Sequence, residues 1–360
     1  MESLGMSRLA DPSFWAGKRV MLTGHSGFKG SWARLWLTQM GAEVTGYGLS
    51  PATAPSLHAL LGPETAASEH FADIRDVDTL ASAVRACDPE IILHMAAQPL
   101  VRESYRTPAE TFDVNVMGTV RLLEAARAAP ALKTILVVTT DKVYRNDESG
   151  RHFPEEAALG GHDPYSGSKA ACELVVSTWR DSYLRERGIG VATARGGNVL
   201  GGGDFSADRL VPDIVRATLS GETLDIRSPM ATRPWQHVLD CLNGYFVYAE
   251  ALHGGMTDVT ALNFGPSPDE RQIPVRDVAA AIQTAMGLPA QWRDASSQDQ
   301  PREMQTLGLD PALAARTLSW RTRLSQDEAI AWTAHWYDGW RRGAGALDLT
   351  RSQIDAFMRG

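Results

Sequence analysis

Cysteine is scarce in this chain of 360 residues, where it occurs only three times, at Cys87, Cys172 and Cys241. The three are far apart and none lies in a Cys-x-x-Cys spacing, which rules out an obvious zinc site and fits a reducing compartment. The nine histidines show no HExxH or similar pattern. We therefore predict no metal centre, and the cytoplasm is the default location.

Long apolar runs are also missing. The first residues, MESLGMSRLADPS, lack the apolar stretch of a signal peptide, and no run reaches membrane-spanning length. Positive charge is in deficit, with 35 Lys and Arg against 43 Asp and Glu, a net charge of −8 and a pI near 5.6. This balance argues against a nucleic-acid or membrane partner, but it permits a local basic pocket for an anionic small molecule.

Regular alternation of strand-like and helix-like segments is what the sequence does contain. The predicted strands cover 18–23, 42–49, 90–97, 133–140 and 190–201, and the predicted helices cover 31–41, 77–87, 112–129 and 163–188. Because the strands are almost continuously apolar, we expect a parallel sheet covered by helices on both faces. The predicted fold class is α/β, a Rossmann-type doubly wound sheet with a smaller, discontinuous α/β substrate lobe.

The composition of the sequence changes after Gly196, where Gly, Pro, Asp and Arg become frequent and helical stretches become shorter. We predict a dinucleotide-binding domain at 14–195 plus 236–265, a substrate lobe at 196–235 plus 266–360, and a tail at 1–13. Tryptophans near the end of the chain recur at helical spacing, which favours core or an interface over a ligand site. They are Trp332, Trp336 and Trp340.

Residues 24–30 read GHSGFKG, with a glycine at every third position between a predicted strand and a predicted helix. Glycine permits a tight turn and lets backbone N–H groups approach a pyrophosphate at the start of the helix. A plain strand-to-helix turn is the alternative, but the context favours cofactor binding. The predicted contacts are Gly24, Ser26, Gly27, Phe28, Lys29 and Gly30.

An acidic residue that would hold the adenosine ribose is missing at the end of the second strand, where the sequence reads GYGLS. Ser50 could bond a ribose hydroxyl instead, or be an ordinary loop serine. Asp73 and Ile74 end a predicted third strand, where Asp can meet the adenine amine, although a plain turn fits as well. The predicted cofactor is NAD, and charge alone does not exclude NADP.

Tyr165 and Lys169 lie at positions i and i+4 of a predicted helix, on one face. A lysine ammonium and an oxidised nicotinamide would both favour the phenolate and lower the tyrosine pKa toward the working pH. The pair could then take a proton from a sugar hydroxyl while hydride leaves the carbon.

These motifs resemble the extended short-chain dehydrogenase/reductase superfamily over nearly the whole chain: GHSGFKG, HMAAQ at 94–98, TTD at 139–141 and YSGSK at 165–169. Longer strings are similar to the CDP-glucose 4,6-dehydratases of that superfamily. They are FWAGKRVMLTGHSGFKGSW, TTDKVY, GGNVLGGGD, DRLVPDIVRA and TRPWQHVLD. The resemblance implies a tightly held nicotinamide cofactor that is reduced and re-oxidised within one turnover. It also implies cofactor contacts at Ala96, Ala97, Gln98 and Asn115.

The resemblance further implies a reaction on CDP-glucose: oxidation at C4, loss of water across C5 and C6, and return of hydride to C6. Tyr165 would then be the base at O4, Thr140 would bond O4, and Asp141 would protonate the leaving C6 hydroxyl. The dTDP-glucose branch carries Glu after this Asp, whereas this chain has Lys142. A neutral lysine could take the C5 proton, a protonated one could only stabilise the enolate, and a mere ion pair with Asp141 is the structural alternative.

Candidate substrate contacts follow from the matching strings, because a diphosphate in an acidic protein needs local arginines. They are Asn198, Arg209 and Arg233, with Arg302 as a weaker candidate and His237 assigned a structural role. Two rivals stay open, a 4-epimerase of the same superfamily and a non-catalytic dinucleotide-binding sensor. The helices near 107–129 and 164–187 are expected to pair with a second copy in a homodimer or homotetramer. The product's deoxysugar pathway, in a surface polysaccharide or a secondary metabolite, is not encoded in these patterns.

Overall fold

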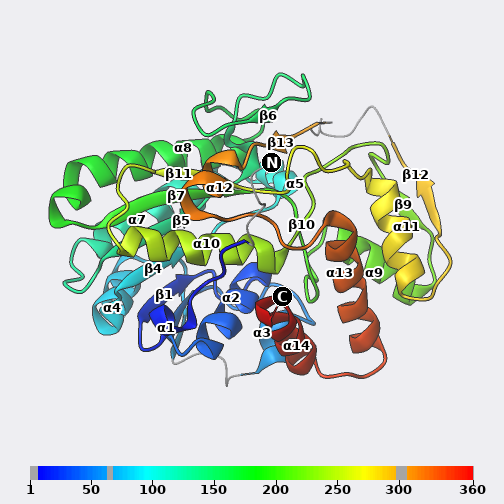
Figure 1. Cartoon of the computed structure of the whole chain (residues 1–360), viewed down its shortest axis with the longest axis horizontal. Coiled ribbons are helices and arrows are strands. Elements are labelled where there is room, and N and C mark those ends of the chain that lie inside the picture. The colour runs from blue at the N-terminus through cyan, green and yellow to red at the C-terminus, as the bar shows by residue number, and fades with distance from the viewer. Residues whose placement is uncertain (1–6, 63–67, 297–305, 360) are drawn as a thin grey trace.

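One seven-stranded parallel sheet organises the chain in the computed structural model, which describes residues 7–62, 68–296 and 306–359 (Figure 1). In spatial order its strands are β11 (Ala261–Phe264), β7 (Gly190–Gly196), β5 (Thr134–Val138), β4 (Ile91–His94), β1 (Arg19–Thr23), β2 (Glu43–Gly48) and β3 (Ser68–Phe71). Every neighbouring pair is parallel. The strand order reverses between β1 and β4, so a ligand crevice is expected outside their carboxyl ends. The predicted Rossmann-type fold is confirmed.

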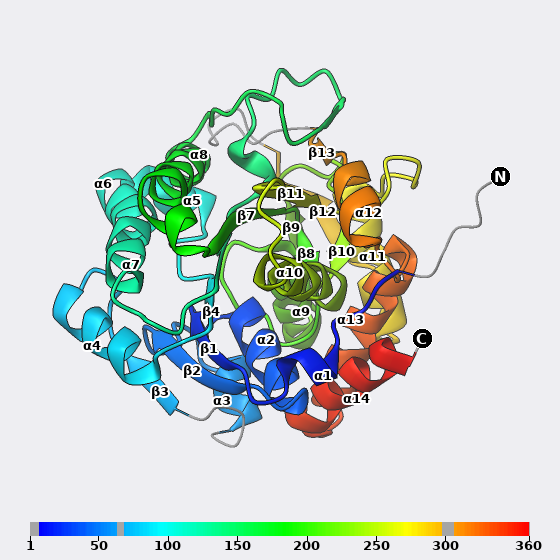
Figure 2. The same ribbon diagram turned by 60° about the vertical axis from the view of Figure 1, so that its left-hand side comes forward.

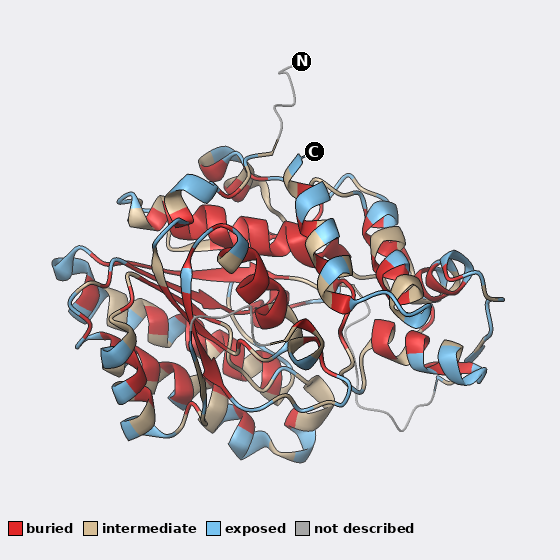
Figure 3. Ribbon diagram, turned by 90° about the horizontal axis from the view of Figure 1, so that it is seen from below, coloured by how far each residue is buried: buried red, intermediate tan, exposed pale blue. Residues whose placement is uncertain are grey.

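The continuous apolar character of the strands has a direct cause, because both faces of the sheet are buried (Figure 3). Val20 and Leu22 of β1 pack into one hydrophobic cluster, and Met21 between them packs into another. Figure 2 shows the two helical layers on either side of the sheet. One layer contains α2 (Phe28–Gln39) and α10 (Val238–His253), and the other contains α4 (Val77–Cys87), α7 (Gly118–Ala126) and α8 (Pro164–Trp179).

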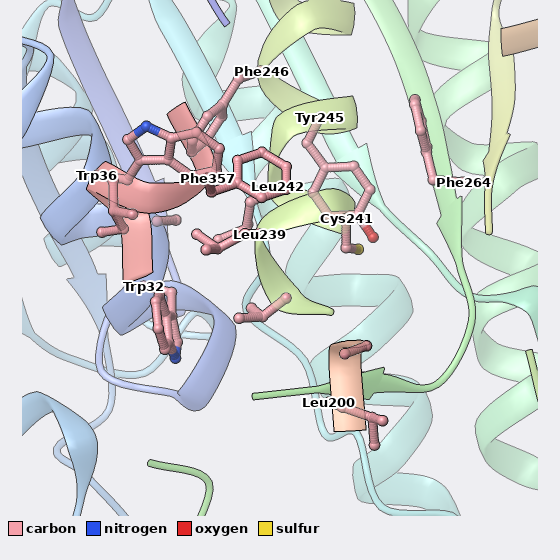
Figure 4. Packing of buried hydrophobic residues seen from close by; sticks show 14 of the residues in the cluster. Trp32, Trp36, Leu200, Leu239, Cys241, Leu242, Tyr245, Phe246, Phe264 and Phe357 are labelled. Atoms are coloured by element: carbon pink, nitrogen blue, oxygen red, sulfur yellow. The ribbon is translucent and has the colours of Figure 1, made fainter. Parts of the chain in front are cut away.

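Tryptophans fill the larger cluster. Trp36 of α2 lies edge-on to Phe246 of α10 and to Phe357 of α14 (Ala346–Arg359), as Figure 4 shows. Trp32, on the same helix, donates from Nε1 to Gly202 O (2.9 Å). Trp336 is fully buried in the same cluster and donates from Nε1 to Thr350 Oγ1 (3.0 Å). Trp332 and Trp340 pack against it. The prediction that the C-terminal tryptophans belong to the core is confirmed.

Two long predicted helices each contain a π-helical turn in the structure. Segment 107–129 consists of α6 (Pro108–Phe112), a π-helical turn η2 (Asp113–Met117) and α7. Segment 163–188 consists of α8, a π-helical turn η4 (Arg180–Leu184) and a 3₁₀ turn η5 (Arg185–Arg187). Asp163 caps α8 with its side chain and Pro164 occupies the first turn, so the predicted start at Asp-Pro is right.

The remaining elements build the lobe and the connections. Helices of this group are α1 (Pro12–Trp15), α3 (Leu57–Leu61), α5 (Val101–Arg106), α9 (Leu210–Ser220), α11 (Val275–Ala285), α12 (Ala312–Leu318) and α13 (Gln326–Arg341). Three small parallel pairs join β9 (Leu224–Ile226) to β12 (Trp292–Asp294), β8 (Val199–Leu200) to β10 (Gln236–His237), and β6 (His152–Phe153) to β13 (Gly308–Leu309). Within the described ranges, no helix has the length and apolarity needed to cross a membrane.

Candidate active site

The glycine loop between β1 and α2 is shaped by close backbone contacts. Gly24 has φ +73°, and a Cβ there would lie 2.8 Å from the backbone nitrogen of Ala96. A Cβ on Gly30 would lie 2.1 Å from the carbonyl oxygen of Gly24. Gly27 is the N-cap of α2 and offers no side-chain cap, so the first N–H groups of the helix are not engaged by one. The loop therefore fits a pyrophosphate at the helix N-terminus.

The predicted adenosine-side residues lie at the ends of β2 and β3. Ser26 Oγ donates to Leu49 O (2.6 Å), which ties the glycine loop to the segment carrying exposed Ser50. Both oxygens of Asp73 accept from Arg75, at 3.0 and 2.7 Å, and Ile74 packs beneath Gly118. Strand β3 ends at Phe71, before Asp73 rather than at it. The cofactor roles of Ser50, Asp73 and Ile74 stay predictions.

A second group of polar side chains lies under the glycine loop. His25, His58 and Glu69 place potential metal-ligand atoms within 4.8 Å of one another. The group already contains a cation, because Arg34 Nη1 donates to Glu69 Oε1 and lies 3.0 Å from His58 Nε2. Burial lowers the pKa of His25 to about 4, so its ring is neutral. These contacts favour a packing role over a metal site.

The predicted nicotinamide-side residues form a hydrogen-bonded chain beyond β4. Thr23 Oγ1 accepts from the backbone N–H of Ala96 (3.2 Å). Asn115 and Gln98 are joined twice, since Gln98 N donates to Asn115 Oδ1 (2.8 Å) and Asn115 Nδ2 donates to Gln98 O (3.1 Å). Asn115 Nδ2 also donates to Ser168 Oγ of α8 (2.9 Å). These hydrogen bonds hold the 96–98 segment, which includes Ala97, against the helix that carries Tyr165 and Lys169.

Strand β5 ends at Val138, two residues earlier than predicted, and Asp141–Val143 form a 3₁₀ turn, η3. This turn lets adjacent side chains meet: Thr140 Oγ1 donates to Asp141 Oδ1 (2.9 Å) and Lys142 Nζ lies 3.2 Å from the same oxygen. Asp141 is 1% exposed, and its Oδ2 has no hydrogen-bond partner among the described residues. That oxygen lies 3.4 Å from where a Cβ of Gly197 would be, at the end of β7. The Asp141–Lys142 ion pair considered from the sequence is therefore present.

Tyr165 lies in the same crevice, where it interacts with Thr140, Arg209 and Asp141. The predicted lowering of its pKa involves a bound nicotinamide as well as Lys169, and the protein's own residues do not produce it. Burial raises the pKa of Tyr165 to about 12, and this outweighs the opposing effects of Thr140 and Arg209. Lys169 is also buried, which lowers its pKa, and its Nζ donates to Val138 O (2.9 Å) at the end of β5.

The predicted substrate residues are spread around the lobe side of the crevice. Asn198 accepts a backbone hydrogen bond from Gln236 (3.1 Å), Arg233 Nη1 donates to Thr232 O (2.8 Å), and Arg209 Nη1 lies 3.9 Å from Asp204 Oδ2. Arg302 lies outside the described residues. His237 is fully buried and its Nδ1 accepts from Leu239 N (3.3 Å) at the start of α10, so its structural role is confirmed.

Two further arginines near these residues, Arg102 and Arg227, were not predicted from the sequence. Asp208 lies 3.4 Å from Arg102 of α5 and 3.3 Å from Arg227 after β9, so it joins the nucleotide domain to the lobe beside Arg209. Arg102 and Arg227 are only about a quarter exposed, at 26% and 27% of their side-chain surface. The position of Arg102 could have indicated a site residue, because it follows HMAAQ at the carboxyl end of a strand. Nothing local distinguishes Arg227.

Comparisons with known proteins agree with this geometry. The sequence model of the GDP-mannose 4,6 dehydratase family matches residues 21–333. The CDP-glucose 4,6-dehydratase of Salmonella typhimurium is 42% identical over 97% of this chain and 99% of its own length. A dTDP-glucose 4,6-dehydratase of Xanthomonas campestris is 28% identical over 88% of this chain and 92% of its own.

Solved structures show the same fold. The dTDP-glucose 4,6-dehydratase of Bacillus anthracis, in complex with NAD, superposes with a TM-score of 0.74 at 21% identity over 91% of this chain and 99% of that one. The UDP-glucose 4-epimerase of Thermus thermophilus, also in complex with NAD, has a TM-score of 0.76 at 25% identity, over 90% and 99% of the two chains.

Proposed function

The chain belongs to the GDP-mannose 4,6 dehydratase family, and on that premise we propose that it converts CDP-glucose to CDP-4-keto-6-deoxyglucose. The observation that carries the reaction type is buried Asp141, whose Oδ2 has no partner among the described residues and whose carboxylate lies close enough to Tyr165 to raise the pKa of that phenol. A 4-epimerase needs no acid at C6, and a dinucleotide-binding sensor needs no Tyr165–Lys169 pair. The 42% identity over nearly the whole chain supports CDP-glucose as the substrate.

NAD is the cofactor that this site supports. The cradle formed by Gly24, Gly27 and Gly30 fits its pyrophosphate, and NAD complexes of the dehydratase and epimerase type share the fold. When bound, the nicotinamide accepts hydride from C4 of the sugar and returns it to C6. Asn115 and Gln98 would orient that end of the cofactor, and Lys169 would hold its ribose while anchored to Val138 O.

The chain's own groups handle the protons. Tyr165 takes the proton from the C4 hydroxyl, and Thr140 bonds the same oxygen. The resulting ketone acidifies C5–H, and removal of that proton gives an enolate. Asp141 then protonates the C6 oxygen as the C6–O bond breaks, so water leaves with that proton and the double bond forms between C5 and C6. C5 regains a proton when the hydride arrives at C6.

Incubation with CDP-glucose tests the assignment. We expect a 4-keto-6-deoxy product that develops a chromophore in base, with little turnover of UDP-glucose, dTDP-glucose or GDP-mannose at equal concentration. Formation of CDP-galactose instead would make the protein an epimerase. Cofactor retention without any sugar turnover would make it a sensor.

We assign the substrate diphosphate to Arg102 of α5 and Arg227 after β9, both of which pair with Asp208, together with Arg209 and Arg233. Arg102→Ala and Arg227→Ala should each raise KM about 10-fold to 100-fold with kcat nearly unchanged, because a charge-assisted hydrogen bond contributes about 1.5–3 kcal/mol. Arg293→Ala is the matched control, since Arg293 pairs with Asp225 on the exposed face of the lobe. An unchanged KM in both site variants would remove these residues from the substrate site.

We further propose that α6–η2–α7 and α8–η4 form the interface of a homodimer. Exposed apolar side chains on these helices support it: Phe112 (41%), Met117 (43%), Leu174 (64%) and Tyr183 (44%). Leu174→Glu is expected to convert the dimer to a monomer in light scattering, whereas Leu219→Glu, at a residue 45% exposed on α9, should not. A parent protein that is already monomeric would refute the proposal.

The domain boundaries at 14–195 plus 236–265 and 196–235 plus 266–360 stay proposals of the same kind.

A further inference from the structure

We propose that a buried ion pair between Glu173 and Arg195 positions the Thr140–Asp141–Lys142 segment for the steps that follow C4 oxidation. The inference rests on the proposed dehydration. Neither residue belongs to the catalytic groups described above. Both act through their neighbours, so they are positioning residues.

Glu173 lies one helical turn beyond Lys169 on α8 and is 5% exposed at its side chain. Its Oε1 accepts from Thr139 Oγ1 (2.6 Å) and from Arg195 Nε (3.0 Å). Its Oε2 accepts from Thr193 Oγ1 (2.7 Å) and from Arg195 Nη2 (2.9 Å). Thr139 immediately precedes Thr140, so the carboxylate holds the entrance to the catalytic segment.

Arg195 holds the other end of the same segment. Its Nη1 donates to the hydroxyl of Tyr144 (2.8 Å) and to the carbonyl of Glu155 (2.9 Å). Tyr144 Oη in turn donates to Asn263 Oδ1 (2.7 Å), and Asn263 Nδ2 donates to Phe153 O (2.8 Å). Residues 139 and 144 are therefore fastened to one ion pair, and the short turn between them carries Thr140, Asp141 and Lys142.

Full pairing explains why this buried charge is tolerated. The bidentate Glu173–Arg195 contact and the two threonine hydroxyls supply four hydrogen bonds to the carboxylate. A carboxamide at position 173 keeps the shape but loses the charge, and it can accept at only one of the two oxygen positions. Thr139 or Thr193 would then lose an acceptor, and Arg195 would lose one of its two hydrogen bonds to residue 173. The turn would gain freedom, whereas Tyr165 and the glycine loop lie outside the loosened segment.

Glu173→Gln tests this directly. We expect kcat to fall about 100-fold with little change in KM, since a displacement of about 1 Å at reacting groups can cost that much. C4 oxidation keeps its base, Tyr165, which lies on α8 outside the loosened segment, and loses only the exact placement of Thr140, whereas the later steps lose the placement of both Asp141 and Lys142. The 4-keto-glucose intermediate should therefore accumulate in single turnovers. In the cofactor-free protein, amide hydrogen exchange in residues 139–144 should accelerate.

Glu250→Gln is the matched control. Glu250 is also a buried carboxylate, 3% exposed at its side chain, and it pairs with Arg8 and accepts from Trp15 Nε1 (2.9 Å) far along the chain from the catalytic turn. Glu250→Gln should lose stability in a similar way. The fraction of 4-keto-glucose that accumulates and the amide hydrogen exchange of residues 139–144 should stay as in the parent. Equal accumulation and equal exchange in Glu173→Gln and Glu250→Gln would overturn the proposal.

Tyr144→Phe covers the case in which Glu173→Gln does not fold. It removes only the hydroxyl between Arg195 and Asn263, and its ring keeps the stacking on Phe153, with centroids 5.2 Å apart. Faster exchange in 139–144 is expected there too, and parent-like exchange would contradict the positioning role. Failure of the parent protein to dehydrate CDP-glucose would refute the proposed function alone, because the exchange measurement needs no substrate.

Discussion

Replacing Tyr165 with phenylalanine is expected to lower kcat about 10³-fold, because the variant has no group that can take the C4 hydroxyl proton while hydride departs. Since the substitution leaves the glycine loop at 24–30 unchanged, the variant should still hold its cofactor, which mass spectrometry of the released nucleotide can measure. Tyr183→Phe is the control, because it removes a phenol hydroxyl on η4, away from the catalytic turn, and keeps the apolar ring assigned to the dimer interface. Parent-like turnover by Tyr165→Phe would exclude this tyrosine as the base.

The environment of Tyr165 explains why the loss should be large. Burial raises its pKa to about 12, so the phenol of the cofactor-free protein is protonated at neutral pH. A base must be deprotonated to act, hence activity requires positive charge close to the hydroxyl. Arg209 contributes such charge, and we expect an oxidised nicotinamide to add to it when it binds. Proton transfer is thereby linked to cofactor binding.

Local patterns account for what the sequence predicted well. The glycine loop, the Asp-Pro start of α8 and the apolar strands depend on near neighbours in the chain, so their spacing carries the information. The placement of Thr140 and Asp141 beside Tyr165 came instead from the resemblance to the dehydratases, and the structure brings these residues together. The exact end of β5 could not be placed from the sequence, and the early end at Val138 is what lets Lys142 reach Asp141.

Contacts between distant segments account for what the sequence did not reveal. Asp208 joins Arg102, which lies 106 positions before it in the chain, to Arg227, which lies 19 positions after it. Arg195 joins α8, the turn after β5 and the loop after β6. Each residue taken alone looks like an ordinary surface or core charge, and only the tertiary fold gives it partners. Glu173 is the exception, since its i+4 relation to Lys169 on one helical face was visible in the sequence.

Asp141 and Lys142 divide the dehydration between them, and paired variants can separate their roles. Asp141→Asn should still exchange the C5 hydrogen of CDP-glucose with solvent deuterium, because oxidation and enolisation do not need the acid at C6, but it should release almost no product. We expect a loss of about 10³-fold in product formation. The Asp141→Asn/Lys142→Met double variant should lose that exchange as well, if the amine of Lys142 takes the C5 proton.

Lys133→Met in the Asp141→Asn background is the control, because Lys133 is an exposed lysine just before β5. Its exchange should match that of Asp141→Asn. Lys142 Nζ lies 3.2 Å from Asp141 Oδ1, and an ammonium that pairs with this carboxylate has no lone pair to accept a proton. The comparison of the variants therefore tests whether Lys142 acts as a neutral amine. Exchange that survives in the double variant would instead confine Lys142 to stabilising the enolate and assign the C5 proton to another group.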